Sequence, residues 1–134
     1  MTTVIRRLAL ILVGTALLFS CGGEGAADNV VTFETADGST FKVRVEDAGT
    51  LERLRDALES GDGRAGIPNG RLAAGDGGVN TGHEWHLVDL EMVDIAIEVC
   101  DGTASMVDAD LDYWLNTVGR FCSWDARVVA IGSE

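Results

Sequence analysis

Basic residues are scarce in this sequence, and their scarcity excludes whole classes of partner. The chain has 10 Lys and Arg residues against 22 Asp and Glu residues, a formal net charge of −12. Binding to phosphate groups needs clustered Lys and Arg side chains, so this composition argues against a nucleic-acid partner. The same charge argues against electrostatic docking on anionic lipid.

Regular repeats and long apolar runs are also lacking. The sequence has a single proline, 17 glycines without a fixed period, and no sustained heptad, which excludes collagen-like and coiled-coil chains. Apart from one stretch near its start it has no long apolar run, which excludes a multi-pass membrane protein. Its 134 residues fit one domain at most.

The first residues have the pattern of an export signal. Arg6 and Arg7 precede an apolar stretch over residues 8–19. That stretch of about a dozen residues is shorter than the roughly 20 needed to span a bilayer. We therefore interpret residues 1–20 as a signal peptide, and we expect the protein to be exported.

The end of this segment resembles a bacterial lipobox. Leu18 lies three residues before Cys21, and the small residue Ser20 lies directly before it. The resemblance implies that Cys21 becomes the N-terminus and carries lipid, so the membrane is one partner. Residues 21–29 then comprise the lipidated cysteine and a flexible tether, and we expect a membrane-anchored lipoprotein of the cell envelope. A plain secretory signal or an uncleaved anchor is the alternative.

Two cysteines remain beyond the lipobox. Cys100 and Cys122 form an even pair in a chain expected to reach an oxidising compartment, where a disulfide is typical. Closing a loop of about 22 residues should stabilise the fold by about 3 kcal/mol. A metal pair or a catalytic thiol is the alternative, but neither cysteine lies in a Cys-x-x-Cys spacing.

Hydrophobic periodicity predicts an α+β domain over residues 30–132, with a mainly antiparallel sheet, two helices on one face and one disulfide. An Asp-Gly pair between the first two alternating runs predicts a hairpin. The Gly-rich region 61–82 is predicted to be a long loop, in which Arg71, Leu72 and Ala73 could form a short strand. The predicted elements are strands at 30–34, 40–46, 84–88, 91–100 and 127–131, and helices at 50–59 and 105–118.

The clearest predicted strand spans residues 91–100. Val93, Ile95, Ile97 and Val99 alternate with less apolar residues, so we expect these four side chains to face the helices. A polar sheet face would then lie on the other side, next to the Gly-rich loop. It is either a binding surface or a solvated face; its expected members are Lys42, Arg44, Asp94 and Glu98, with Glu34 and His86 as further candidates.

Histidine is rare, and the two histidines lie three residues apart. On a strand, His83 and His86 point to opposite faces, which argues against a shared metal ion. We assign no metal site, no cofactor and no catalytic residue. Trp114 lies on an apolar helical stripe and is expected in the core, whereas Trp124 is expected to pack against the disulfide.

Several short motifs together resemble a known family. They are Trp85-His86-Leu87, Ile97-Glu98-Val99-Cys100-Asp101-Gly102, Leu111-Asp112-Tyr113-Trp114, and Cys122-Ser123-Trp124 with Arg127-Val128-Val129. The pattern is similar to a sparsely characterised family of small secreted or lipid-anchored domains, related to the N-terminal domain of a slime-mould secreted protein. The resemblance supports the disulfide and the domain limits and implies no activity. Its recurrent positions suggest five candidate binding residues: His86, Glu98, Asp101, Trp124 and Arg127.

The function expected from the sequence is a non-enzymatic, lipid-anchored binding module for a protein, a peptide or a small ligand. The alternative is a hydrolase or metal-dependent enzyme that uses His86 with Glu98 or Asp101. A purely structural component of the envelope is a third reading.

Overall fold

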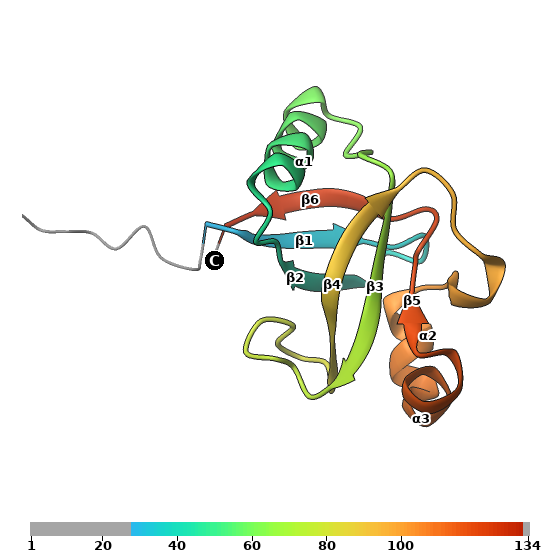
Figure 1. Ribbon diagram of the computed structural model, residues 1–134. Coiled ribbons are helices and arrows are strands. Elements are labelled where there is room, and N and C mark those ends of the chain that lie inside the picture. Colours follow the sequence, from blue (N-terminus) through green and yellow to red (C-terminus); the bar gives the residue numbers. More distant parts are fainter. Residues whose placement is uncertain (1–27, 133–134) are drawn as a thin grey trace, which may run out of the picture.

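The computed structural model describes residues 28–132 (Figure 1). The predicted signal peptide and Cys21 therefore lie outside the described residues. Within residues 28–132, no helix is both long and apolar enough to cross a membrane. The elements in chain order are β1 (Val30–Glu34), β2 (Thr40–Arg44), α1 (Ala48–Ser60), β3 (Ile67–Ala74), β4 (Trp85–Val93), the 3₁₀ turn η1 (Glu98–Cys100), α2 (Ala104–Ala109), α3 (Leu111–Tyr113), the π-helical turn η2 (Trp114–Val118), β5 (Arg120–Phe121) and β6 (Arg127–Ile131).

The strands form two antiparallel sheets of three strands each. The first has the order β2-β1-β6 and the second has the order β4-β3-β5. The α+β class with antiparallel pairing is thus confirmed, and the strands divide between two sheets. In both sheets the strand with two partners, β1 or β3, lies in the centre, so β2 and β4 are edge strands.

Aromatic rings join the two sheets. Phe41 of the first sheet stacks on Phe33 at a centroid distance of 5.2 Å, and it lies 5.2 Å from Phe121 and 5.9 Å from Trp85 in the second sheet. Trp114 extends the cluster through Phe121 at 5.8 Å. All five side chains are buried, so the core lies between the sheets, and the prediction that Trp114 is a core residue is confirmed.

The first helix begins two residues earlier than predicted. Asp47 is its N-cap: the Asp47 carboxylate accepts a hydrogen bond of 2.7 Å from the Thr50 N–H. That bond lowers the pKa of Asp47. Leu54 is buried on the inner side of the helix, and α1 lies over β6 in Figure 1, whereas α2 and α3 lie beside β5.

The prediction of a long loop over residues 61–82 is wrong, because this region contains β3, the central strand of the second sheet. The short strand considered for Arg71, Leu72 and Ala73 is present as the second part of β3. Its buried positions alternate along the strand and are Pro68, Gly70 and Leu72. Only Leu72 is a residue type that a search for alternating hydrophobic residues would recognise. Gly70 packs closely against β4: a Cβ atom there would lie 3.1 Å from the Leu87 Cβ atom, so a larger residue would push the neighbouring atoms by a few tenths of an ångström. The first part of the strand was therefore hidden by residue types that normally indicate loops.

The predicted strand over residues 91–100 is also wrong beyond Val93. Val93 pairs with Ile67, which is the first residue of β3. The residue before Ile67 is Gly66, whose φ of +104° is not that of a strand. Strand β4 therefore has no partner past this pair, and the chain leaves the sheet. The side chains that we expected to face the helices are exposed instead, by 87% for Ile95, 66% for Ile97 and 56% for Val99.

The second predicted helix, over residues 105–118, is broken. Asp110, at φ −142° and ψ 61°, separates α2 from α3, and the last turn is π-helical. Thr103 is the N-cap of α2, and its hydroxyl oxygen accepts a hydrogen bond from the Met106 N–H. The apolar stripe of the prediction is nevertheless kept, because Val107 and Trp114 are both buried.

The predicted disulfide is present. Cys100 and Cys122 are bonded at a Cα–Cα distance of 5.1 Å, and both residues are buried. The bond joins the end of η1 to the residue that follows β5, and the Cys122 N–H also donates to the Cys100 carbonyl oxygen at 2.8 Å. The chain that leaves the sheet after Val93 is thus attached again to the body of the domain.

The hairpin turn between β1 and β2 docks on the start of α2. The Asp37 carboxylate accepts hydrogen bonds from the Ser105 hydroxyl, from the Ser39 hydroxyl at 2.6 Å and from the Ser39 N–H at 3.0 Å. These bonds favour the ionised form and hold the pKa of Asp37 well below its usual range. The Ala104 N–H donates to the Thr35 hydroxyl at 3.3 Å across the same contact.

Replacing Asp37 should make the thermal stability of the domain depend less on pH in the acidic range. Because the folded-state pKa is depressed, ionised Asp37 stabilises the fold above its ordinary pKa of 3.8, and this contribution is lost as the pH falls toward the lower folded value. Asp37→Asn should therefore melt at a lower temperature than the native chain at pH 7, and the gap should narrow below pH 3.8. Thermal melts followed by circular dichroism measure this gap, with exposed Asp94→Asn as the control. A gap that stays constant with pH would contradict the assignment.

Candidate functional site

The two edge strands β2 and β4 approach each other at one end, where a single buried side chain bridges them. The Asn80 side chain is 1% exposed. Its Oδ1 atom accepts from the Lys42 N–H of β2, and its Nδ2 atom donates to the Trp85 carbonyl oxygen of β4, both at 2.8 Å. The amide of Asn80 thus takes the place that a peptide group would have in a strand between β2 and β4.

His83 closes the same end of the gap. Its Nε2 atom lies 2.8 Å from the Thr40 carbonyl oxygen of β2, and its Nδ1 atom lies 2.9 Å from the Asp108 carboxylate. The Trp85 indole N–H also donates to Asp108 at 2.8 Å. Across the gap, Thr40 is joined to His83, and Lys42 is joined through Asn80 to Trp85. Residue numbers therefore rise in the same direction on both sides, so β2 and β4 run parallel to each other.

Beyond Asn80, the main chains of both edges face the gap. Two backbone hydrogen bonds flank the β1–β2 ladder: the Thr35 N–H donates to the Ser39 carbonyl oxygen, and the Val45 N–H donates to the Asn29 carbonyl oxygen. With the register of the ladder, they show that the odd-numbered residues of β2 exchange backbone hydrogen bonds with β1. The backbone N–H and C=O groups of the even-numbered residues therefore point away from β1. The hydrogen bond from the Lys42 N–H to Asn80 confirms this, and Arg44 is the next even-numbered residue.

The same alternation applies to β4. The Gly75 N–H donates to the Glu84 carbonyl oxygen, so even-numbered residues at the start of β4 bond to β3. The backbone N–H and C=O groups of Trp85 and Leu87 consequently point away from β3. The Trp85 carbonyl oxygen accordingly accepts a hydrogen bond from Asn80. The backbone groups of Arg44 and Leu87 thus face each other's strand without a described strand between them.

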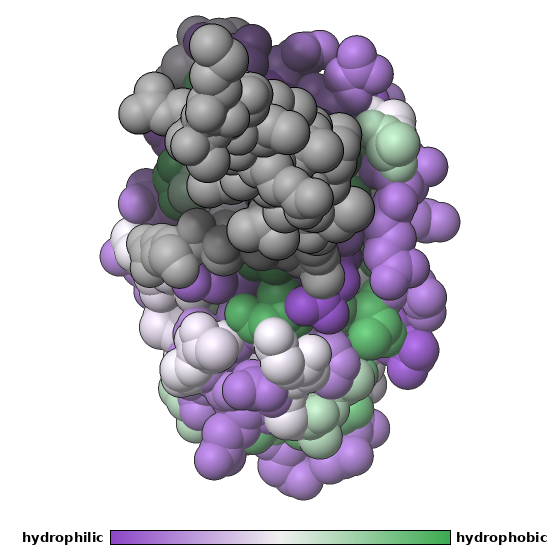
Figure 2. Space-filling view, turned by 90° about the vertical axis from the view of Figure 1, so that its left-hand side faces the viewer, coloured by the Kyte–Doolittle hydropathy of each residue, from purple (hydrophilic) through white to green (hydrophobic). Residues whose placement is uncertain are grey.

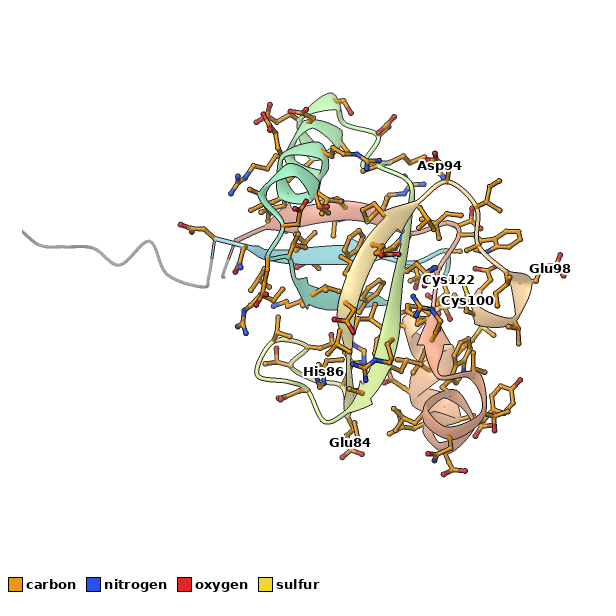
Figure 3. The ribbon with its side chains drawn as sticks, viewed as in Figure 1. Glu84, His86, Asp94, Glu98, Cys100 and Cys122 are labelled. Carbon is orange, nitrogen blue, oxygen red and sulfur yellow. A yellow bond between two sulfur atoms is a disulfide. The ribbon has the colours of Figure 1, made fainter. Side chains whose placement is uncertain are left out.

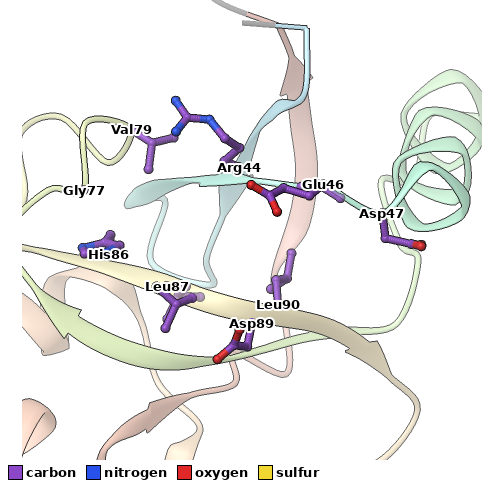
Figure 4. A pocket seen from close by; sticks show the side chains of 11 residues that line it. Arg44, Glu46, Asp47, Gly77, Val79, His86, Leu87, Asp89 and Leu90 are labelled. Atoms are coloured by element: carbon purple, nitrogen blue, oxygen red, sulfur yellow. The ribbon is translucent and has the colours of Figure 1, made fainter. Parts of the chain in front are cut away.

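A groove of about 420 Å³ lies at this position (Figure 4). Its walls are the end of β2 with the following residues, the middle of β4, and the loop that carries Gly77 and Val79. Glu46 from the first wall and Leu90 from the second extend into the space between the strands (Figure 4). The groove therefore combines open main-chain edges with both apolar and charged side chains.

His86 lines this groove, and the Gly-rich loop holds its ring. The Nδ1 atom lies 2.7 Å from the Gly75 carbonyl oxygen, so the ring donates there, and within residues 28–132 its Nε2 atom has no hydrogen-bond partner. Gly77 has φ +62°, and a Cβ atom at this residue would lie 2.5 Å from the imidazole. A larger residue at position 77 would displace His86, so glycine is required for the wall of the groove.

The other four predicted binding residues do not join His86. Asp101 and Trp124 lie together near the disulfide, where the Asp101 carboxylate accepts from the Trp124 N–H at 2.9 Å. Glu98 is exposed on η1, on the other side of the molecule from His86 in Figure 3. Arg127 lies on β6, next to a different hollow. The pairing of His86 with Glu98 that an enzyme would need is therefore not assembled.

The polar sheet face forms only in part. Arg44 is exposed on β2 as expected, but Asp94 and Glu98 follow the end of β4 and belong to no sheet. Within the described part of the chain, no three His, Cys, Asp or Glu side chains are grouped so that they could hold a metal ion. The site is thus a groove with mixed side chains and not a cluster of reactive groups.

The sequence did not predict the contacts of Asn80 and Val79, because the region around them was interpreted as a surface loop. Both are buried although they lie in the Gly-rich loop, and Asn80 contacts a residue 38 positions away. The one available signal was the isolated apolar Val79 between glycine-rich stretches, which indicates that this part of the loop packs against the body of the domain.

The comparison with known protein families agrees with the resemblance noted in the sequence. A family model described as the BP-74 N-terminal domain matches residues 27–133, which includes both walls of the groove and the disulfide. No curated protein and no solved structure matches the chain. Because the match extends over most of its length, the chain belongs to the BP-74 N-terminal domain family.

Proposed function

We propose that this protein is an exported, non-enzymatic binding module that is tethered to the cell envelope through lipid on Cys21. Its ligand is an extended peptide segment, which enters the groove between β2 and β4 and adds a strand there. The observation that carries the proposal is the bridge made by Asn80, whose amide already bonds to both edges as a peptide group would.

The direction of the two edges supports a bound strand. Because β2 and β4 run the same way across the gap, one segment antiparallel to both would continue the antiparallel pairing of each sheet. Neighbouring strands are about 4.7–4.9 Å apart, so a fully inserted strand needs edges separated by about 9.5 Å. Cα atoms of β2 and β4 come within 8 Å of each other in the free protein, so binding of the segment requires the two edges to move apart. The main-chain groups of Arg44 and Leu87 supply donors and acceptors for strand addition, which is a recurring way of recognising peptides.

The side chains of the groove add selectivity to this main-chain binding. Leu87 and Leu90 offer an apolar surface, and His86 offers an imidazole nitrogen. Glu46 brings a carboxylate into the groove, whereas the Asp47 carboxylate is occupied by the N-terminus of α1. We therefore expect an extended segment with apolar side chains on one face and at least one hydrogen-bonding side chain on the other.

The position of the chain ends supports the tether. Val30 and Gly132 are hydrogen-bonded to each other, so both ends of the described chain lie on one side of the domain (Figure 1). Figure 2 views that side, where the visible described side chains are mainly hydrophilic. A lipid on Cys21 would hold this side toward the membrane, and removal of residues 1–20 leaves a strongly acidic domain that anionic lipid repels.

The peptide site is tested with Arg44→Pro in the full chain. Proline at an edge strand removes the outward N–H and keeps the β1–β2 ladder, because Arg44 does not bond to β1. The probe is a pool of random ten-residue peptides displayed on phage, from which binders are synthesised and titrated by calorimetry. We expect Arg44→Pro to weaken binding more than tenfold, whereas Arg44→Ala, which keeps the N–H, changes it by less than threefold.

Main-chain recognition is distinguished from side-chain recognition with the same peptides. N-methylation of alternate residues on the edge that pairs with β2 should abolish binding, because it removes the donors of the added strand. Equal binding of methylated and unmethylated peptides would overturn the proposal of strand addition. So would equal effects of Arg44→Pro and Arg44→Ala.

The tether is tested by the intact mass of the chain extracted from a bacterial host that expresses residues 1–134. We expect a chain that begins at Cys21 and carries the added mass of lipid. The Cys21→Ala variant should be released from the membrane fraction or keep its uncleaved leader. A native chain without lipid that is recovered in the soluble fraction would contradict the tether without affecting the groove.

A further inference from the structure

A second surface of the molecule is apolar and lies away from the groove. Ile95, Ile97 and Val99 are each more than half exposed, and Trp124 is 37% exposed. Side chains of this size are normally buried, and exposed apolar residues that gather in one place indicate a docking surface. We refer to Ile95, Ile97, Val99 and Trp124 as the disulfide-loop surface.

The disulfide holds these residues close together. The Ile97 carbonyl oxygen lies 3.2 Å from Cys100 Sγ and 3.5 Å from Cys122 Sγ. Trp124 follows Cys122 by two residues, and its N–H is fixed to Asp101, the residue after Cys100. Ile95, Ile97 and Val99 are therefore displayed from a segment that is anchored at β4 on one side and at the disulfide on the other. Trp124 belongs to the chain after Cys122, and its bond to Asp101 places its backbone beside the end of that segment.

The fold offers no cover for this surface within residues 28–132. The alternation from Val93 to Val99 is typical of a strand, yet β3 ends its pairing at Val93 and no other described strand lies beside the segment. In Figure 1 the segment (gold) protrudes on the side opposite the chain ends. A local pattern that conflicts with the observed structure is typical of a site selected for binding.

Acidic side chains surround the apolar ones. Asp94, Glu98 and Asp101 are exposed and alternate with or follow the apolar residues of the segment. Figure 3 shows the Glu98 carboxylate at the outer edge of the molecule. A complementary surface therefore needs apolar side chains with Lys or Arg next to them.

The charges also decide between possible occupants. If two copies paired antiparallel through this segment around Ala96, Asp94 of each would lie opposite Glu98 of the other, and like charges directly opposite are destabilising. An anionic membrane is repelled by the same carboxylates. A partner protein that carries positive charge is attracted.

We propose that the disulfide-loop surface is a docking site for a second protein, through a segment that presents aliphatic or aromatic side chains flanked by Lys or Arg. The site is separate from the groove between β2 and β4, so the module holds two partners at once. The proposal does not depend on the lipid tether or on the peptide site.

The test uses the full chain. A chain that carries lipid is placed in nanodiscs of neutral phosphatidylcholine, with empty nanodiscs as the background, and a chain without lipid is measured in solution. The probes are three fluorescent twelve-residue peptides, which alternate Lys with Leu, Glu with Leu, or Lys with Ser, and binding is measured by anisotropy. We expect the Lys/Leu peptide to bind at least tenfold more tightly than the other two. Ile95→Ser combined with Ile97→Ser should remove that preference, whereas Val129→Ser, at an exposed valine of β6, should keep it.

Charge reversal provides the matched control. Asp94→Lys with Glu98→Lys should shift the preference to the Glu/Leu peptide, whereas Glu52→Lys with Glu59→Lys, the same change of net charge on exposed residues of α1, should not. Equal effects of the two pairs, or equal binding of the three peptides, would overturn the proposal. Two further results would overturn it: a dimer that Ile97→Ser dissociates, and quenching of tryptophan fluorescence by brominated phosphatidylcholine in the nanodiscs.

Discussion

The packing of aromatic rings between the two sheets is the constraint on which the rest of the structure depends. Phe41 contacts Trp85 and Phe121 across the interface, and within residues 28–132 no ladder of backbone hydrogen bonds connects the sheets. Burying an aromatic side chain contributes about 2–3 kcal/mol, so a few rings are enough to hold the sheets together. Because side chains do this, the edges of β2 and β4 can stay open.

The open edges and the loop that partly closes them define the candidate site. Asn80 satisfies the first pair of edge groups, and His83 closes the end of the gap. The groove begins where these bridges stop. The acidic, disulfide-anchored segment after β4 exists for a related reason, since β3 is too short to pair with it. Both proposed binding surfaces therefore arise at places where a strand lacks a partner.

The sequence predicted what depends on local pattern. The hairpin of β1 and β2, the disulfide and the buried Trp114 are confirmed, because alternation, a cysteine pair and helical spacing are local or pairwise signals. Of strand β3, only the part at Arg71, Leu72 and Ala73 was considered from the sequence. The part before it was missed because Pro68 and Gly70, which normally indicate loops, occupy its buried positions. Of the site, His86 was named from its family motif, whereas Asn80 was missed because its role depends on contacts made only in the folded chain.

Amide hydrogen exchange of the free protein, followed residue by residue by NMR, tests most directly whether the edges are open. The Arg44 and Leu87 amides face the groove, whereas those of Val43 and Val88 bond within the sheets. We expect the first two to exchange much faster than the second two. Slow exchange at all four amides would show that β2 and β4 are joined in a closed sheet, and it would contradict the groove on which the proposed function rests.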